Sequence, residues 1–102
     1  MIPVHLWQAA ITDICHIWDW LSQLSSEAAT RISDGLIDAA LTLGEFPNRH
    51  PLVRGLEGEV HRFTVGSWAV LYECTDARVH ILRIAAGSTD LFALDLRPSE
   101  EK

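Results

Sequence analysis

The chain has little cysteine and no evident cluster of metal ligands. Its 102 residues include only Cys15 and Cys74, each inside an apolar-patterned stretch. Neither forms a CxxC pair or has an electropositive neighbourhood, the features that favour a metal ligand or a reactive thiol. The five histidines are scattered, with no two at metal-ligand spacing on one predicted helix. We therefore expect both cysteines to be small buried hydrophobic residues, and we expect no metal and no other cofactor.

Long apolar runs are lacking as well. No run approaches the roughly 18 residues that span a bilayer, and Met1 to His5 lack the basic and apolar regions of a signal peptide. A chain of this length can bury one modest core. We expect a cytoplasmic protein without membrane contact. We also expect one domain over residues 1–102, with its core at about 3–92 and a short acidic C-terminal tail.

The chain also lacks an excess of basic residues. The formal net charge is −6 and the sequence pI is about 5.2. Such a balance repels nucleic acid at long range, whereas general DNA and RNA binders usually carry a strong positive excess. The charge therefore favours a protein partner over direct nucleic-acid binding.

Two consecutive segments show helical periodicity. The first spans about residues 8–24 and the second about 26–43, and Ser25 or Ser26 can cap the start of the second. Gly44 is predicted to end that helix in a left-handed conformation. The predicted buried stripes are Ile11, Ile14, Cys15, Trp18 and Leu21 in the first helix, and Ala29, Ile32, Leu36, Ala40 and Leu43 in the second. So short a connection makes the helices antiparallel neighbours.

Beyond a Pro- and Gly-containing loop, the apolar period changes to two. Residues 61–65 and 68–74 alternate around a Gly66-Ser67 turn, and a second turn at 75–77 leads into a strand over 78–85. With the short apolar segment Val4 to Trp7, the order is β-α-α-β-β-β. This predicts an α+β fold in which an antiparallel helical hairpin packs on one face of an antiparallel sheet, leaving the other face available.

Several segments, in this order, resemble the RelE/ParE toxin superfamily. They are IWDWL at 17–21, EAATRI at 27–32, EFPNRHP at 45–51 and the long stretch 54–84, in which V-G-x-W-x-V-L-Y at 65–72 is the most specific. The resemblance covers about residues 3–92. It implies the toxin of a type II toxin–antitoxin pair, neutralised by its antitoxin, which when freed disables either the translating ribosome or DNA gyrase.

The two targets require different chemistry. Cleaving RNA through its 2′-hydroxyl needs a proton acceptor, a cation near the developing phosphorane charge and an acid for the leaving oxygen. RNA-cleaving relatives place basic residues at positions that here read Val60, Thr64, Ala69, Ser88 and Thr89. Only Arg62 keeps a cation, while His61 and His80 are lone strand histidines, which are more often structural than catalytic. We therefore assign no catalytic residue.

The resemblance to ParE-type members implies inhibition of gyrase through protein contacts. We expect a cognate antitoxin, of the ribbon-helix-helix type, as partner and DNA gyrase as target; a homodimer stays open. The alternatives are a RelE-like, ribosome-dependent mRNA endonuclease that uses Arg62, with His61 or His80 as a further candidate, and a toxin homologue with weakened activity.

Five side chains are candidates for binding the partner or target. Arg54, Arg62 and Arg83 can set the register of a docked segment as rim cations, although simple surface ion pairing is as good a reading of Arg62 and Arg83. Whether Arg62 and Arg83 share a sheet face depends on the length of the second turn. Trp18 and Trp20 lie two apart on a helix, so at least one must be partly exposed or covered by a partner.

Overall fold

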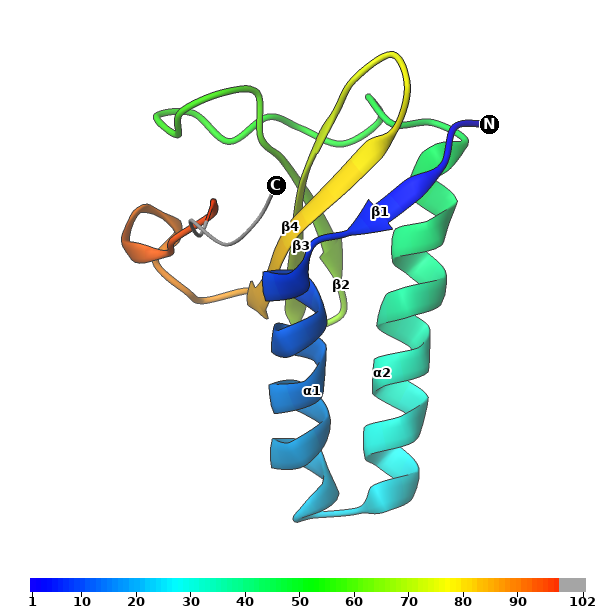
Figure 1. Cartoon of the computed structure of the whole chain (residues 1–102). Coiled ribbons are helices and arrows are strands. Elements are labelled where there is room, and N and C mark those ends of the chain that lie inside the picture. The colour runs from blue at the N-terminus through cyan, green and yellow to red at the C-terminus, as the bar shows by residue number, and fades with distance from the viewer. Residues whose placement is uncertain (98–102) are drawn as a thin grey trace.

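The computed structural model describes residues 1–97. Its elements follow the predicted order: β1 (Val4–Leu6), α1 (Gln8–Ser22), α2 (Ser26–Leu41), a short 3-10 turn η1 (Thr42–Gly44), β2 (His61–Val65), β3 (Trp68–Cys74), β4 (Val79–Ala86) and a second 3-10 turn η2 (Leu91–Ala93). The helices lie side by side, joined by a short turn at the end remote from β1 (Figure 1). The predicted acidic tail falls largely on residues 98–102, outside the described part of the chain.

The strands form one sheet in the order β1-β4-β3-β2. β2, β3 and β4 make the predicted antiparallel meander, and the first turn is at Gly66-Ser67, where Gly66 has a φ of 59°. β1 pairs with β4 in parallel, so the complete sheet is mixed. Because β1 leads directly into α1, this pairing places the start of α1 beside the edge of β4.

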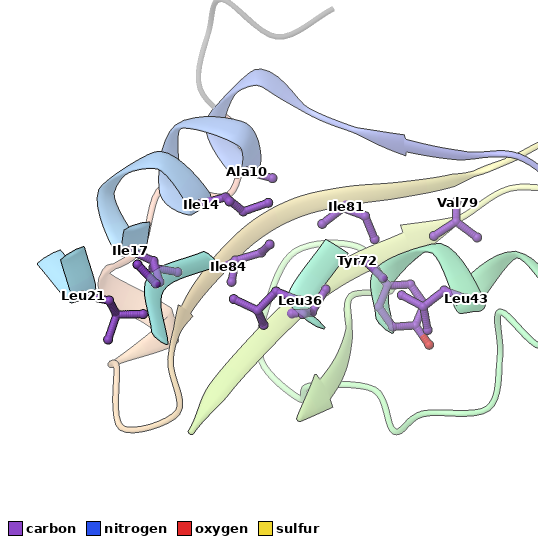
Figure 2. Packing of buried hydrophobic residues seen from close by; sticks show 13 residues of the cluster. Ala10, Ile14, Ile17, Leu21, Leu36, Leu43, Tyr72, Val79, Ile81 and Ile84 are labelled. Carbon is purple, nitrogen blue, oxygen red and sulfur yellow. The ribbon is translucent and has the colours of Figure 1, made fainter. Parts of the chain in front are cut away.

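The helices cover one face of the sheet and form the main core with it. Figure 2 shows the buried side chains of α1 and α2 facing residues of β3 and β4, including Tyr72 and Ile84. The Ser25 hydroxyl accepts a hydrogen bond from the Ala28 amide at 3.2 Å, which confirms the predicted cap. In α2 the predicted stripe is buried except for Ile32, which is half-buried.

The predicted buried stripe of α1 is right at two of its five positions, Ile14 and Leu21, and wrong at the other three. Its buried residues are Ala10, Ile14, Ile17 and Leu21. Ile11, Cys15 and Trp18 are exposed instead. The sequence offers two adjacent apolar lines, and the line through Ile14 and Ile17 is the one that faces the sheet. In this orientation Asp13 accepts a hydrogen bond from the Ile84 amide of β4 at 2.9 Å.

Gly44 does not adopt the predicted left-handed conformation. Within residues 1–97 only Gly55, Gly58 and Gly66 have positive φ. A Cβ at Gly44 would lie 2.3 Å from the carbonyl oxygen of Ile2, whose amide donates to the Gly44 carbonyl at 3.0 Å. Glycine is therefore needed because the N-terminal segment approaches the backbone closely.

The second face of the sheet is covered, which makes the prediction of an available face wrong. Val60, Leu71, Leu82, Leu91 and Leu96 form a separate buried cluster there. Half-buried side chains of the loop before β2, Val53 and Leu56, and of the C-terminal segment, Leu94, complete it. In Figure 1 these segments, green and orange to red, lie on the side of the sheet away from α2. The central strand β3 is thus buried on both faces.

The cysteines also differ from the prediction. Cys15 is exposed on α1, and Cys74 is half-buried. The Cys74 thiol donates to Oδ1 of Asn48 at 3.2 Å, and burial raises the pKa of this thiol.

No helix among the described residues is long and apolar enough to cross a membrane.

Candidate functional site

The sheet register places Arg62 and Arg83 on the same face. Both residues are cross-strand partners of Leu71, Arg62 from β2 and Arg83 from β4. A bulge in the β3–β4 pairing between Leu71 and Tyr72 brings Arg83 into this position, because it inserts one extra residue into β4. The two arginines therefore flank one buried leucine of the second cluster.

Each nitrogen of the Arg83 guanidinium donates a hydrogen bond within the fold. Its Nε and Nη2 donate to the two carboxylate oxygens of Asp13, each at 2.8 Å, and Nη1 donates to the carbonyl of Asp95 at 2.8 Å. Oδ2 of Asp13 also accepts from the amide of Ile84 at 2.9 Å. The hydrogen-bonded carboxylate raises the pKa of Arg83. This arginine ties α1 and the C-terminal segment to the sheet edge.

Arg62 is half-buried and also bonded to the chain. Its Nη2 donates to the carbonyl of Gly87 at 2.8 Å, and its backbone amide donates to the carbonyl of Pro51 at 2.9 Å. Arg54, by contrast, is exposed on the loop before β2. The structure thus brings Arg62 and Arg83 onto one face but engages both internally.

The positions that carry cations in RNA-cleaving relatives do not form an open polar surface. Val60 and Ala69 are completely buried. Thr64 and Ser88 are exposed, and Thr89 is half-buried. Val60 belongs to the apolar cluster that covers this face of the sheet.

The two strand histidines have structural partners. Nδ1 of His61 donates to the carbonyl of His50 at 2.7 Å, and the buried His61 ring stacks on Tyr72 with centroids 4.9 Å apart. Adjacent residues of a strand point to opposite faces, so His61 and Arg62 do not converge. Nδ1 of His80 accepts from Nε1 of Trp7 at 3.2 Å, and burial lowers the pKa of His80.

Five exposed large apolar side chains lie on the helical hairpin: Ile11, Trp18, Trp20, Leu24 and Leu41. Trp18 is 37% exposed and Trp20 is 58% exposed. Nε1 of Trp18 makes a long hydrogen bond of 3.5 Å to the hydroxyl of Thr30, so Trp18 leans toward α2. Both tryptophans are therefore accessible from solvent, which is the arrangement that the sequence predicted for at least one of them. Nothing in the sequence marked Ile11 and Leu41, which are also exposed apolar residues of this hairpin.

Comparisons with known proteins agree with the fold. Residues 4–91 match the family described as the ParE toxin of the type II toxin–antitoxin system, parDE. A solved chain of the chromosomal ParDE toxin–antitoxin system from P. aeruginosa has a TM-score of 0.75 and 19% sequence identity, over 84% of this chain and 96% of that chain. No curated protein matches this sequence. The family match covers most of the sequence, and the chain therefore belongs to the ParE toxin family of type II toxin–antitoxin systems.

Proposed function

We propose that this chain is a ParE-type toxin that inhibits DNA gyrase through protein contacts and is neutralised by a cognate antitoxin. The observation that carries the proposal is the closed second face of the sheet. Where a nuclease of this superfamily needs accessible cations, Val60 and Ala69 are completely buried. Five of the nine exposed large apolar side chains of the described residues lie on the helical hairpin, and accessible apolar side chains of this kind are expected for a protein that acts by binding other proteins.

Ribosome-dependent cleavage of mRNA is the disfavoured alternative. It needs an acid, a base and a cation around one phosphate. The guanidinium of Arg62 is bonded to Gly87, His61 lies on the other sheet face, and Nδ1 of His80 is occupied by Trp7. His61 and Arg62, neighbours on one strand, point to opposite faces of the sheet and cannot act together on one RNA bond.

The proposed partners follow from the family. The matching family description and the solved P. aeruginosa relative both name a ParDE system, which supports an antitoxin as the partner of this chain. We assign the antitoxin to the ribbon-helix-helix type and place the pair in the cytoplasm, where gyrase acts.

Induction of the chain without its antitoxin tests the proposed target. Gyrase inhibition predicts filamentous growth with an SOS response while protein synthesis continues. The Arg62→Ala variant should arrest growth as well as the native chain does. Immediate loss of protein synthesis with codon-specific mRNA cleavage, abolished in Arg62→Ala, would establish the nuclease instead. Growth without arrest would contradict both and indicate a homologue with weakened activity.

A further inference from the structure

A cavity of about 310 Å³ opens between α2 and the turn that joins β2 to β3. Its walls are formed by Ile32, Gly35 and Leu36 of α2 and, on the sheet side, by Val65, Gly66 and Trp68. None of the lining side chains in the described part of the chain carries a charge. Cavities that hold small-molecule ligands range from about 300 to 1,000 Å³, so this one is at the small end of the range. Its size suits a single large side chain better than a cofactor.

Gly35 leaves room in this cavity that the fold does not require. It lies in the middle of α2, and a Cβ at this position would meet nothing within 4 Å. Glycine inside a helix is less favourable than alanine, because it loses more conformational freedom on folding. Gly44, in contrast, is needed because a Cβ there would meet the Ile2 carbonyl. A glycine that costs stability without a structural need indicates a role in keeping the cavity open.

The cavity lies on the flank of α2 that faces away from α1. The bond between Trp18 and Thr30 marks the flank that faces α1. Because a helix turns about 100° per residue, Gly35 lies about 140° around the helix axis from Thr30. The exposed apolar side chains of α1 therefore belong to a different surface. A toxin that is bound by an antitoxin and also binds a target can use a separate surface for each partner.

The surroundings of the cavity favour an uncharged occupant with one polar group. Arg31 and Asp38 share the exposed side of α2 with Gly35, because residues three and four apart are neighbours on a helix, and their charges are opposite. Ser67 is exposed on the sheet side, and its hydroxyl makes no hydrogen bond within residues 1–97. The hydroxyl of a tyrosine or the indole N–H of a tryptophan usually finds a hydrogen-bond partner when the ring is buried. Either side chain matches these walls and this hydroxyl.

We infer that the cavity receives a tyrosine or tryptophan side chain of the target protein. The inference rests on the proposed function and adds the contact site and the chemistry of the target segment. Aromatic side chains that fill well-packed pockets are the usual anchors of protein interfaces. The Trp68 indole in the cavity wall gives the incoming ring an aromatic neighbour, and the Ser67 hydroxyl pairs with its polar group.

Filling the cavity from within tests the inference. Gly35→Leu places an apolar side chain in the cavity, whereas Asp34→Leu adds the same side chain at the preceding exposed residue, which does not line it. The Kd for purified gyrase is measured for both variants, and urea unfolding verifies that both are folded. We expect Gly35→Leu to raise the Kd at least about thirtyfold, the loss of one aromatic anchor. Asp34→Leu should change the Kd less than about threefold.

Gly35→Ala provides a second, independent readout. Its methyl group takes up part of the cavity, so the Kd for gyrase should rise about threefold to tenfold. The melting temperature should rise as well, because alanine is the better helix former. A glycine without a role in binding would give the higher melting temperature with an unchanged Kd, and that result would overturn the inference.

The outcomes separate the inference from the proposed function. If the native chain binds gyrase and Gly35→Leu binds it equally well, the site is wrong and the proposed target stands. If Gly35→Leu weakens binding of the antitoxin from the adjacent reading frame but not of gyrase, the cavity receives the antitoxin and the inference is overturned. If the folded native chain neither binds gyrase nor inhibits supercoiling, the proposed function fails, and the inference fails with it.

Discussion

The ion pair between Asp13 and Arg83 should be a main determinant of stability. Asp13 accepts two hydrogen bonds from the Arg83 guanidinium and one from the Ile84 amide. The Asp13→Ala variant removes all three and leaves a charged guanidinium and a backbone donor at the sheet edge. The side chain of Asp13 is only 11% exposed and that of Arg83 is 20% exposed, so water replaces the carboxylate incompletely.

The expected cost follows from this burial. Removing one partner of a buried ion pair costs about 3–5 kcal/mol. Because both side chains keep some contact with solvent, we expect Asp13→Ala to lower the free energy of unfolding by about 3 kcal/mol, at the bottom of that range. For a domain of this size the melting temperature should fall by roughly 12–24 °C.

Urea unfolding followed by tryptophan fluorescence measures this loss. The control is Glu73→Ala, which breaks the ion pair with Arg97. The side chains of that pair are 25% and 37% exposed, so the expected cost is no more than about 1 kcal/mol. Equal losses in the two variants, or a loss below about 1 kcal/mol for Asp13→Ala, would refute the structural role given to this pair.

Three further predictions concern the core, the glycines and pH. Leu82→Ala should lower the free energy of unfolding, measured in urea, by about 2–5 kcal/mol, because Leu82 is fully buried in the second cluster. A loss below about 1 kcal/mol would mean that the sheet face away from the helices is open. Gly35→Ala should stabilise the protein by about 0.5–1 kcal/mol, because a Cβ at this helical position meets nothing within 4 Å. Gly44→Ala should destabilise the protein, because its Cβ would meet the Ile2 carbonyl at 2.3 Å. Similar melting temperatures for the two variants would contradict the close approach at Gly44. Burial lowers the pKa of both His50 and His80. Below about pH 6.5 the unfolded chain therefore binds more protons than the folded chain, and the free energy of unfolding should decrease as pH falls. A free energy of unfolding that is constant or rises from pH 7 to pH 5 would show that these rings are not held in the neutral form.

The elements that local sequence determines were predictable. The cap at Ser25, the turn at Gly66-Ser67 and the switch from helical to alternating periodicity each depend on a few neighbouring residues. Together with the short connections, these signals give the order of the elements and the antiparallel meander. The parallel pairing of β1 with β4 depends on residues more than seventy positions apart, which no local pattern indicates.

The rotation of α1 and the covered sheet face required tertiary contacts. The apolar lines through Ile11 and Ile14 are adjacent on the helix, and no local pattern distinguishes them; the observed orientation is accompanied by core packing on the sheet and by the bond between Asp13 and β4. The residues that cover the second face, such as Val53 and Leu96, lie in segments without regular periodicity. One signal was present: residues 69–72 form an unbroken apolar run, which is typical of a strand buried on both faces.

The placement of the candidate arginines could be predicted only in part. Arg62 and Arg83 share a face because the bulge in β4 shifts the pairing of β4 with β3 by one residue. Such a bulge has no clear sequence signature here. Their internal bonds to Gly87 and Asp13 join segments far apart in the chain. The exposure of at least one of the two tryptophans, in contrast, followed from helix geometry alone.

DNA supercoiling by purified gyrase, measured with and without this chain, tests the central claim most directly. The proposed function predicts that the chain blocks supercoiling of relaxed plasmid, that the cognate antitoxin restores it, and that Arg62→Ala remains inhibitory. Unchanged supercoiling at a large excess of folded chain, together with cleavage of mRNA in the ribosomal A site that Arg62→Ala abolishes, would contradict it.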